Sequence, residues 1–269
     1  TYRGGARQCW PVIPGPIVEQ DPKRRGLNYR KSGGETSGIW KTENGGDNWM
    51  ELTNGLPAGD IVGRIGLDIS ISNPHILYAF YDKHINEDED YSFLGIFKTS
   101  DGGNSWTQTN DGAIYGMNSR FGWYFGQIRI DPENPDRVFA MGVDLVRTEN
   151  GGNSWETIAG YFNSDAIHVD HHAMIIDPNT GRILEGNDGG LYISDNYGNS
   201  WFHLNNIPLT QFYAIEVDYQ QPHRIYGGTQ DNNTIRTISG NLNDWNPILG
   251  GDGFYTLVNP ENSNIIYAE

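Results

Sequence analysis

The sequence predicts an all-β protein, specifically a β-propeller of four-stranded antiparallel blades. A short box ending in tryptophan recurs along the chain, and a second turn motif lies between successive boxes. Between these turns lie short segments rich in β-forming residues, and no long helical pattern competes with them. Four short strands in a repeat of roughly 40–60 residues are typical of propeller blades. We therefore expect about five blade units, the first and last of them incomplete.

The box has the pattern Ser/Thr-x-Asp/Asn-x-Gly-x-x-Trp and predicts a tight hairpin. Its glycines supply positive φ angles, and its Asp or Asn can accept hydrogen bonds from the backbone of the turn. The tryptophan then begins the next strand and is expected to bury its ring between layers. These residues are therefore interpreted as structural. The copies occupy residues 42–49, 99–106, 148–155 and 194–201, with a degenerate copy at 239–245.

The second motif predicts the order of strands within a blade. Each copy combines the end of one strand, a turn rich in Pro and Asn, and the start of another strand. Each unit then reads strand A, turn, strand B, loop, strand C, box and strand D. In such a meander the A–B turns and the boxes share one face, and the B–C and D–A loops share the other, which we call the loop face. The copies begin at Ser70, Asp131, Asp177, Asp218 and Asn259.

Composition and charge limit the partners. Residues 1–33 are irregular and predict a loop or arm, whereas residues 34–269 hold the blades, and both ends of the chain are expected to be truncated. The net charge of −16 argues against a nucleic-acid partner, whose phosphates require a basic surface. No apolar stretch approaches the roughly 18 residues of a membrane helix.

Several segments resemble a known family. The boxes, together with HVDHHAMIIDP (168–178), EGNDGGLYIS (185–194), QFYAIEVD (211–218) and GGTQDNNT (227–234), resemble bacterial secreted Asp-box (BNR) repeat and sortilin-like β-propeller proteins, often named glycosyl hydrolases. The resemblance implies a propeller fold and a secreted or periplasmic location. The segment around Asp188 resembles an Asp-x-Gly-Gly segment of xyloglucanase-type enzymes, which implies a catalytic aspartate there. Fold alone does not determine function.

The unusual polar residues are expected on the loop face. Asp188 and Asp231 lie in successive B–C loops and are the candidate pair of catalytic carboxylates. When the strand A copies are aligned, Asp170 matches Gln211 and Asp252, so that three successive blades place polar groups at one level. The predicted ligand-binding residues are Asp170, Gln211, Gln230, Asn232 and Asp252.

The stretch HVDHH suggests a metal site. His168, Asp170 and His172 alternate along the chain and would share one side of a strand, where they could bind a divalent metal ion. His171 would point to the opposite side. Two alternatives stay open: the imidazoles bond neighbouring loops, or they take part in proton transfer or substrate binding. The acidic run Asn86–Asp90 could bind calcium, although such runs are usually solvated loops.

Three functions remain compatible with the sequence. The first is an extracytoplasmic binding or scaffold module whose loop face binds a protein or glycan partner. The second is a glycoside hydrolase of xyloglucanase-like type with Asp188 as one carboxylate. The third is an extrinsic subunit of a larger or membrane-bound complex.

Overall fold

A computed structural model describes residues 33–83, 89–160, 167–205, 207 and 209–269 of the chain. The described residues form β-strands and loops, with one short 3-10 turn, η1 (Gly112–Ile114), so the predicted all-β class is confirmed. The predicted arm lies outside the described residues except for residue 33, and so do residues 86–88 of the acidic run. No described segment forms a helix with the length and hydropathy that a membrane span needs.

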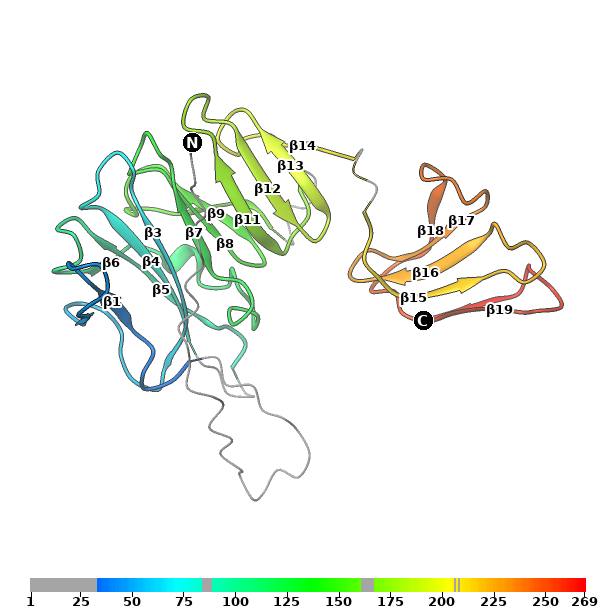
Figure 1. Ribbon diagram of the computed structural model, residues 1–269, viewed down its shortest axis with the longest axis horizontal. Coiled ribbons are helices and arrows are strands. Elements are labelled where there is room, and N and C mark those ends of the chain that lie inside the picture. The colour runs from blue at the N-terminus through cyan, green and yellow to red at the C-terminus, as the bar shows by residue number, and fades with distance from the viewer. Residues whose placement is uncertain (1–32, 84–88, 161–166, 206, 208) are drawn as a thin grey trace, which may run out of the picture. The chain divides into compact units, whose positions relative to one another are not determined.

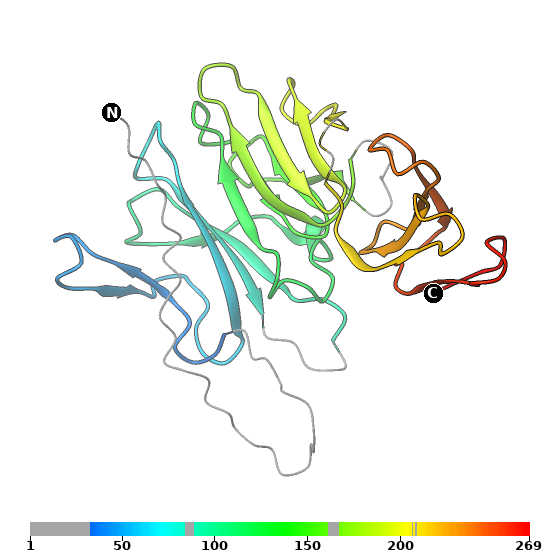
Figure 2. The ribbon, with the colours of Figure 1, turned by 45° about the vertical axis from the view of Figure 1, so that its right-hand side comes forward.

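Four four-stranded sheets follow one another along the chain, and each consists of consecutive antiparallel strands (Figures 1 and 2). This is the predicted order A to D. The first sheet is β3 (Val62–Ile69), β4 (Leu77–Lys83), β5 (Phe93–Thr99) and β6 (Thr107–Gln108). The second is β7 (Gln127–Ile130), β8 (Val138–Met141), β9 (Leu145–Thr148) and β10 (Glu156–Ala159). The third is β11 (His171–Ile176), β12 (Ile183–Asn187), β13 (Gly190–Ser194) and β14 (Phe202–His203). The fourth is β15 (Phe212–Val217), β16 (Ile225–Thr229), β17 (Thr234–Thr237) and β18 (Trp245–Leu249).

A two-stranded sheet precedes this series and another follows it. The first pairs β1 (Ile39–Lys41) with β2 (Met50–Leu52), which correspond to strands C and D of a blade. The second pairs β19 (Thr256–Val258) with β20 (Ile266–Ala268), which correspond to strands A and B. The described residues therefore hold four full blades and two half blades, and the first and last units are incomplete as predicted.

The A–B turns are held by one repeated hydrogen bond. The Asp or Asn that ends strand A accepts a bond from the backbone N–H two residues later, which fixes the turn locally. The distances are 2.9 Å from Asp131 Oδ1 to Glu133 N, 2.9 Å from Asp218 Oδ1 to Gln220 N, and 2.8 Å from Asn259 Oδ1 to Glu261 N. Local chemistry therefore places every strand B beside its strand A.

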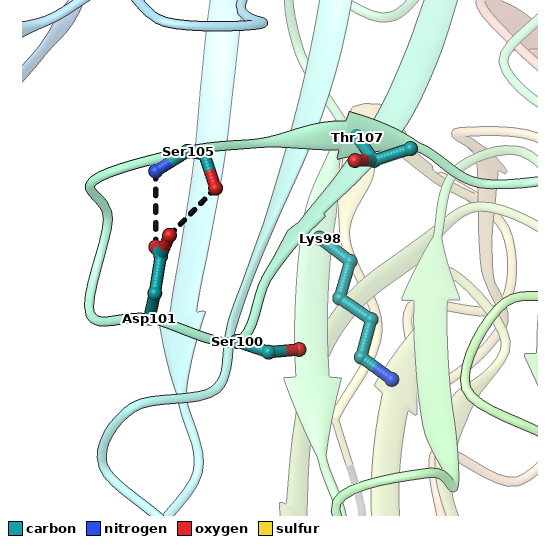
Figure 3. A pocket seen from close by; sticks show the side chains of 5 residues that line it. All are labelled: Lys98, Ser100, Asp101, Ser105 and Thr107. Atoms are coloured by element: carbon teal, nitrogen blue, oxygen red, sulfur yellow. Dashed lines mark hydrogen bonds between the residues drawn. The ribbon is translucent and has the colours of Figure 1, made fainter.

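The boxes lie in the C–D hairpins and share a second pattern. In the hairpin of β5 and β6, Asp101 accepts bonds from the backbone N and the hydroxyl of Ser105, at 2.9 and 2.6 Å (Figure 3). Asn150 and Asn196 accept the matching backbone bond at 2.9 Å. In the degenerate copy, Asp244 accepts a bond from Ser239 N at 2.7 Å. The polar groups of the boxes are thus occupied within their own turns.

The tryptophans of three boxes, Trp106, Trp155 and Trp201, pack against the preceding sheet. Trp106 and Trp155 are only 5% and 6% exposed, and Trp155 Nε1 donates to Thr109 Oγ1 at 3.0 Å. Trp49 departs from the predicted burial, with 58% of its surface exposed. Its box belongs to the β1–β2 sheet, and the described residues provide no sheet before it.

The core consists of layers between neighbouring sheets. One cluster joins Tyr78 and Phe80 of β4 to Ile128 of β7, and another joins Phe139 of β8 to Met174 of β11. The first strands contact each other in three pairs of neighbouring sheets, β3 with β7, β7 with β11 and β15 with β19. In these sheets strand A is the inner strand, as predicted, and its start lies on the loop face.

Candidate functional site on the loop face

Three carboxylates meet on the loop face. Asp170 directly precedes β11, Asp188 lies in the β12–β13 turn, and Asp231 lies in the β16–β17 loop. One oxygen from each lies within 4.8 Å of the others. Asp231 N also donates to Asp252 Oδ1 at 2.9 Å, which brings a fourth carboxylate beside the group. We call Asp170, Asp188, Asp231 and Asp252 the carboxylate cluster.

Burial and mutual repulsion perturb these acids. Burial is the main reason that the pKa of Asp170 rises to about 6, and the charges of Asp188 and Asp231 add to the shift. The pKa of Asp231 is also raised, first by burial and then by Asp252 and Asp188. A raised carboxyl pKa means that the folded protein stabilises the ionised carboxylate less well than water does. The cluster is therefore a place where a cation would be stabilised.

His172 is the nearest protein cation to the cluster. Its Nε2 lies 2.6 Å from Asp188 Oδ1, and this hydrogen bond is the main cause of the raised pKa of His172. The imidazolium form is thereby favoured, so one of the carboxylates has a partner. The ring also lies against Tyr124 and Phe125, with centroid separations of 5.4 and 5.2 Å.

A buried pair beneath the site holds the Asp188 turn. His171 is fully buried, and its Nδ1 lies 2.7 Å from Glu185 Oε1. Asn187 Nδ2 donates to the other oxygen of Glu185 at 2.9 Å, and Asn187 Oδ1 accepts a bond from Gly189 N at 2.9 Å. This chain of bonds connects β11 to the β12–β13 turn, so the position of Asp188 is fixed from below.

The backbone conformation directs two of the carboxylates. Asp170 and Asp231 have φ angles of 67° and 54°, in the left-handed region that Asp tolerates better than most residues. Asp170 N donates to Val143 O at 3.0 Å, and Asp188 N donates to Asp170 O at 3.3 Å. Neighbouring loops therefore hold the unusual backbone in place, which is common at functional sites.

Exposed aromatic rings border the cluster on two sides. Trp123 and Tyr124 are both exposed and lie before β7, and their ring centroids are 5.4 Å apart. Tyr213 and Phe254 stack at 4.5 Å with an interplanar angle of 2° and are also exposed. The charges of Asp252, Asp231 and Asp188 contribute, after burial, to a raised pKa of Tyr213, so its phenol lies within reach of the cluster.

The segment that carries Trp123 and Tyr124 is tied to a buried acid. Asp82 accepts a bond from Asn118 Nδ2 at 3.4 Å, and burial raises its pKa to about 7. A Cβ on Gly122 would lie 1.6 Å from Asp82 Oδ1, so only glycine fits at that position. Arg64 donates a hydrogen bond to the carbonyl of Tyr124. The rings are therefore presented by an ordered loop.

The structure rearranges the predicted metal ligands. His171 and His172 point into different surroundings, but His168, Asp170 and His172 do not form the predicted group. His168 Nδ1 lies 2.9 Å from Val169 O, and His172 bonds Asp188. The reason is that β11 begins only at His171, so strand alternation does not extend back to His168. Among the described residues, the donors with metal-like spacing are Asp170, Asp188 and Asp231, an all-oxygen set that suits Ca²⁺ or Mg²⁺ better than zinc.

Hydrogen bonds connect several of the predicted ligand-binding residues. Asn232 Nδ2 donates to Asp188 O at 3.1 Å and to Gln230 O at 2.9 Å, which joins the two B–C loops. Gln211 is exposed and directly precedes β15. The two proposed catalytic acids, Asp188 and Asp231, are neighbours.

The aromatic rings were not among the predicted site residues, although a signal for them exists. His172, Tyr213 and Phe254 each follow the aligned positions Asp170, Gln211 and Asp252 by two residues. Equivalent positions of aligned repeats lie at the same level of neighbouring blades, so alignment of the A strands could have predicted a row of planar side chains.

A hollow on the box face differs from the carboxylate cluster in its electrostatics. A hollow of about 280 Å³ there is lined by Lys98, Ser100, Asp101, Ser105 and Thr107 (Figure 3). Lys98 Nζ lies 3.1 Å from Asp136 Oδ1, and Asp101 is bonded within its own box. The charged groups of this hollow are therefore already paired.

Comparisons with known proteins give distant likenesses. No family model matches the chain. A curated oligoxyloglucan-reducing end-specific xyloglucanase from Emericella nidulans is 20% identical over 195 residues, which cover 70% of this chain and 23% of that protein. The structure of a GH74 xyloglucanase from Xanthomonas campestris is 14% identical with a TM-score of 0.49, over 87% of this chain and 48% of the other. A structure of YCF48 bound to D1 peptide is 15% identical with a TM-score of 0.42, over 87% of this chain and 70% of the other.

The chain thus spans about a quarter of the curated relative and about half of the xyloglucanase structure. The fold assignment rests on the chain's own topology, in which meandering four-stranded antiparallel sheets repeat and their first strands adjoin. The protein is a β-propeller protein.

Proposed function

We propose that this protein is an extracytoplasmic binding module whose loop face binds a basic segment of a protein partner at the carboxylate cluster. The observation that carries this proposal is the convergence of Asp170, Asp188 and Asp231 within 4.8 Å, beside exposed aromatic rings. A lysine or arginine side chain would neutralise the cluster and lie against the rings of Tyr213 or Tyr124.

Electrostatics favour a cationic ligand over a neutral glycan. The raised pKa of Asp170 and that of Asp231 both reflect charges that the protein compensates incompletely, and a bound cation would supply the missing compensation. The net charge of −16 would also attract a basic partner over longer distances. A glycan would gain from the rings but would leave the carboxylates mutually repelling.

The test is the binding of a labelled peptide in which arginines alternate with Gly-Ser pairs, followed by fluorescence anisotropy. We expect Asp188→Asn and Asp231→Asn each to weaken binding about tenfold, and raised salt to weaken it in the wild type. The matched control is Asp47→Asn, which removes the same charge from an exposed residue of the first box.

Two results would overturn the proposal. Equal losses in Asp188→Asn and Asp47→Asn would show that only the overall charge matters. Tight binding of neutral β-glucans, with no binding of the basic peptide, would show that the ligand of this site is a glycan.

A glycoside hydrolase is the second candidate, favoured by the curated xyloglucanase relative and by adjacent acids, of which Asp170 has a pKa raised to about 6. In that function Asp188 is one catalytic carboxylate, and Asp170 or Asp231 is the acid. The spacing is less favourable. Inverting enzymes separate their carboxylates by roughly 6.5–9.5 Å and retaining enzymes by about 5–5.5 Å, whereas oxygens here approach within 4.8 Å.

Hydrolysis of xyloglucan oligosaccharides separates this candidate from the first. A hydrolase would release reducing ends, and Asp188→Ala would abolish that release while the fold persists. Unchanged hydrolysis in Asp188→Ala would exclude Asp188 as a catalytic residue. The third function, an extrinsic subunit of a membrane complex, stays a prediction that co-purification with membranes would test.

A further inference from the structure

A second site on the loop face lies away from the carboxylate cluster. A hollow of about 300 Å³ is formed by Lys83 at the end of β4, by residues 89–93 at the start of β5, and by Tyr115 after η1. Its lining combines three aromatic residues, two carboxylates and one ammonium group. These residues are Lys83, Glu89, Asp90, Tyr91, Phe93 and Tyr115.

The aromatic residues form a corner with exposed walls. The rings of Tyr91 and Tyr115 have centroids 5.0 Å apart and an interplanar angle of 75°. Tyr91 is 42% exposed and Tyr115 is 58% exposed. Phe93 packs on Phe80 of the core at 5.3 Å and provides an anchored third ring.

The hollow is held in place before any ligand binds. Ser92 N donates to Ser119 O at 2.8 Å, which ties the residue after Tyr91 to the segment that follows Tyr115. Lys83 N donates to Ser92 O, which ties the same residue to the end of β4. Because the two walls are already fixed, little conformational entropy would be lost on binding.

The charges of the lining favour a cation. Lys83 Nζ lies 2.6 Å from Glu89 Oε1, so its charge is offset within the hollow, and Asp90 adds a second carboxylate. Asp90 also contributes to the raised pKa of the Tyr91 phenol, after the larger effect of the Tyr115 phenol. Aromatic faces combined with a carboxylate are the surroundings in which proteins bind ammonium groups.

We propose that this hollow binds an organic ammonium group against the faces of Tyr91 and Tyr115, with Asp90 as its counter-ion. The ligand class includes a lysine side chain, a methylated lysine and a free quaternary amine such as choline. This site is independent of the proposed function, since none of its residues belongs to the carboxylate cluster.

The experiment compares three labelled peptides with a neutral Gly-Ser background, whose central residue is lysine, trimethyllysine or norleucine. Choline is added as a competitor. We expect the two charged peptides to bind and norleucine, which keeps the apolar chain without the charge, to bind at least tenfold more weakly. Competition by choline would assign the site to free amines as well, whereas lack of competition would restrict it to peptides.

Variants locate the binding. Tyr115→Ala should weaken it about tenfold, Asp90→Asn about threefold, and Tyr115→Phe should retain it because the ring face remains. Tyr255→Ala is the control for loss of another exposed tyrosine. The double variant Asp188→Asn/Asp231→Asn should bind the trimethyllysine peptide as the wild type does, although the proposed function requires it to lose the arginine peptide.

Three results would overturn the proposal: equal binding of the norleucine peptide, unchanged binding in Tyr115→Ala, or no binding of either charged peptide. Loss of binding only in the Asp188→Asn/Asp231→Asn variant would assign the cation to the carboxylate cluster instead. Both Tyr91 and Tyr115 are exposed, so a melting curve like that of the wild type is expected for each variant.

Discussion

The aspartates of the box face and of the loop face have opposite electrostatic surroundings. On the box face, the hydroxyl and backbone N–H of Ser105 hold the pKa of Asp101 far below its usual range, and Ser239 lowers the pKa of Asp244 in the same way. On the loop face, burial and neighbouring carboxylates raise the pKa of Asp170 to about 6 and that of Asp231 in the same direction.

The difference separates structure from function. A box carboxylate finds its donors within its own turn, so its charge is used to fold the hairpin. The loop-face carboxylates find mainly each other, and this arrangement costs stability unless a ligand compensates it. Carboxyl pKa values that are shifted without any benefit to folding are expected at a binding or catalytic site.

The largest difference is expected in the free energy of unfolding, between loss of a box tryptophan and loss of a loop-face aromatic ring. Trp106→Ala removes a buried ring and should lower the free energy of unfolding by about 3–5 kcal/mol. Tyr124→Ala removes an exposed ring and should lower it by less than about 1 kcal/mol. Urea unfolding measures both. Similar losses would mean that the loop-face rings are structural and would weaken their assignment to the site.

A smaller difference is expected in the melting temperatures of variants that lack an aspartate of the box face or of the loop face. Asp101→Ala removes the acceptor of three hydrogen bonds and should lower the melting temperature by roughly 3–6 °C. Asp101→Asn is the matched control and should change it little, because Asn150 and Asn196 make the same backbone bond in their boxes. Asp231→Asn should leave the melting temperature unchanged or raise it, since one repelling charge is removed.

The sequence predicted the fold well because the fold depends on local chemistry. The hydrogen bonds of Asp131 and Asp101 connect residues only two to four positions apart, so their patterns are visible in the chain. The site depends on distant loops and on backbone angles. The positive φ of Asp170 has no sequence signature, and neither has the start of β11 at His171, beyond which strand alternation does not extend back to His168. Asp188 and Asp231 lie close together in the structure, because the repeat order fixes which loops share a face.

The pH dependence of stability should have opposite slopes for the two faces. The pKa of Asp101 is depressed in the folded state, so its stabilisation is present above about pH 4 and is lost as the pH falls. The pKa of Asp170 is raised to about 6, so its contribution is largest below about pH 4 and is lost as the pH rises through 6.

Melting curves between pH 3 and pH 7.5 measure this difference. The deficit of Asp101→Ala relative to the wild type should shrink as the pH falls below about 4. The melting temperature of Asp170→Asn should rise relative to that of the wild type between about pH 4 and pH 6, and the difference should stay constant above pH 6. Parallel profiles for the two variants would mean that the two faces do not differ in their electrostatics.

The smallest effect is expected in binding, and it connects the electrostatics to the proposed function. As the pH rises from 5 to 7.5, Asp170 ionises because its pKa is raised to about 6. This ionisation makes the cluster more negative, so the affinity for the arginine peptide should rise about two- to fivefold. Asp170→Asn should remove the part of this rise that is centred near pH 6. Affinity that falls with rising pH would contradict a cationic ligand, because a glycosidic or other neutral ligand has no reason to prefer the more highly charged cluster.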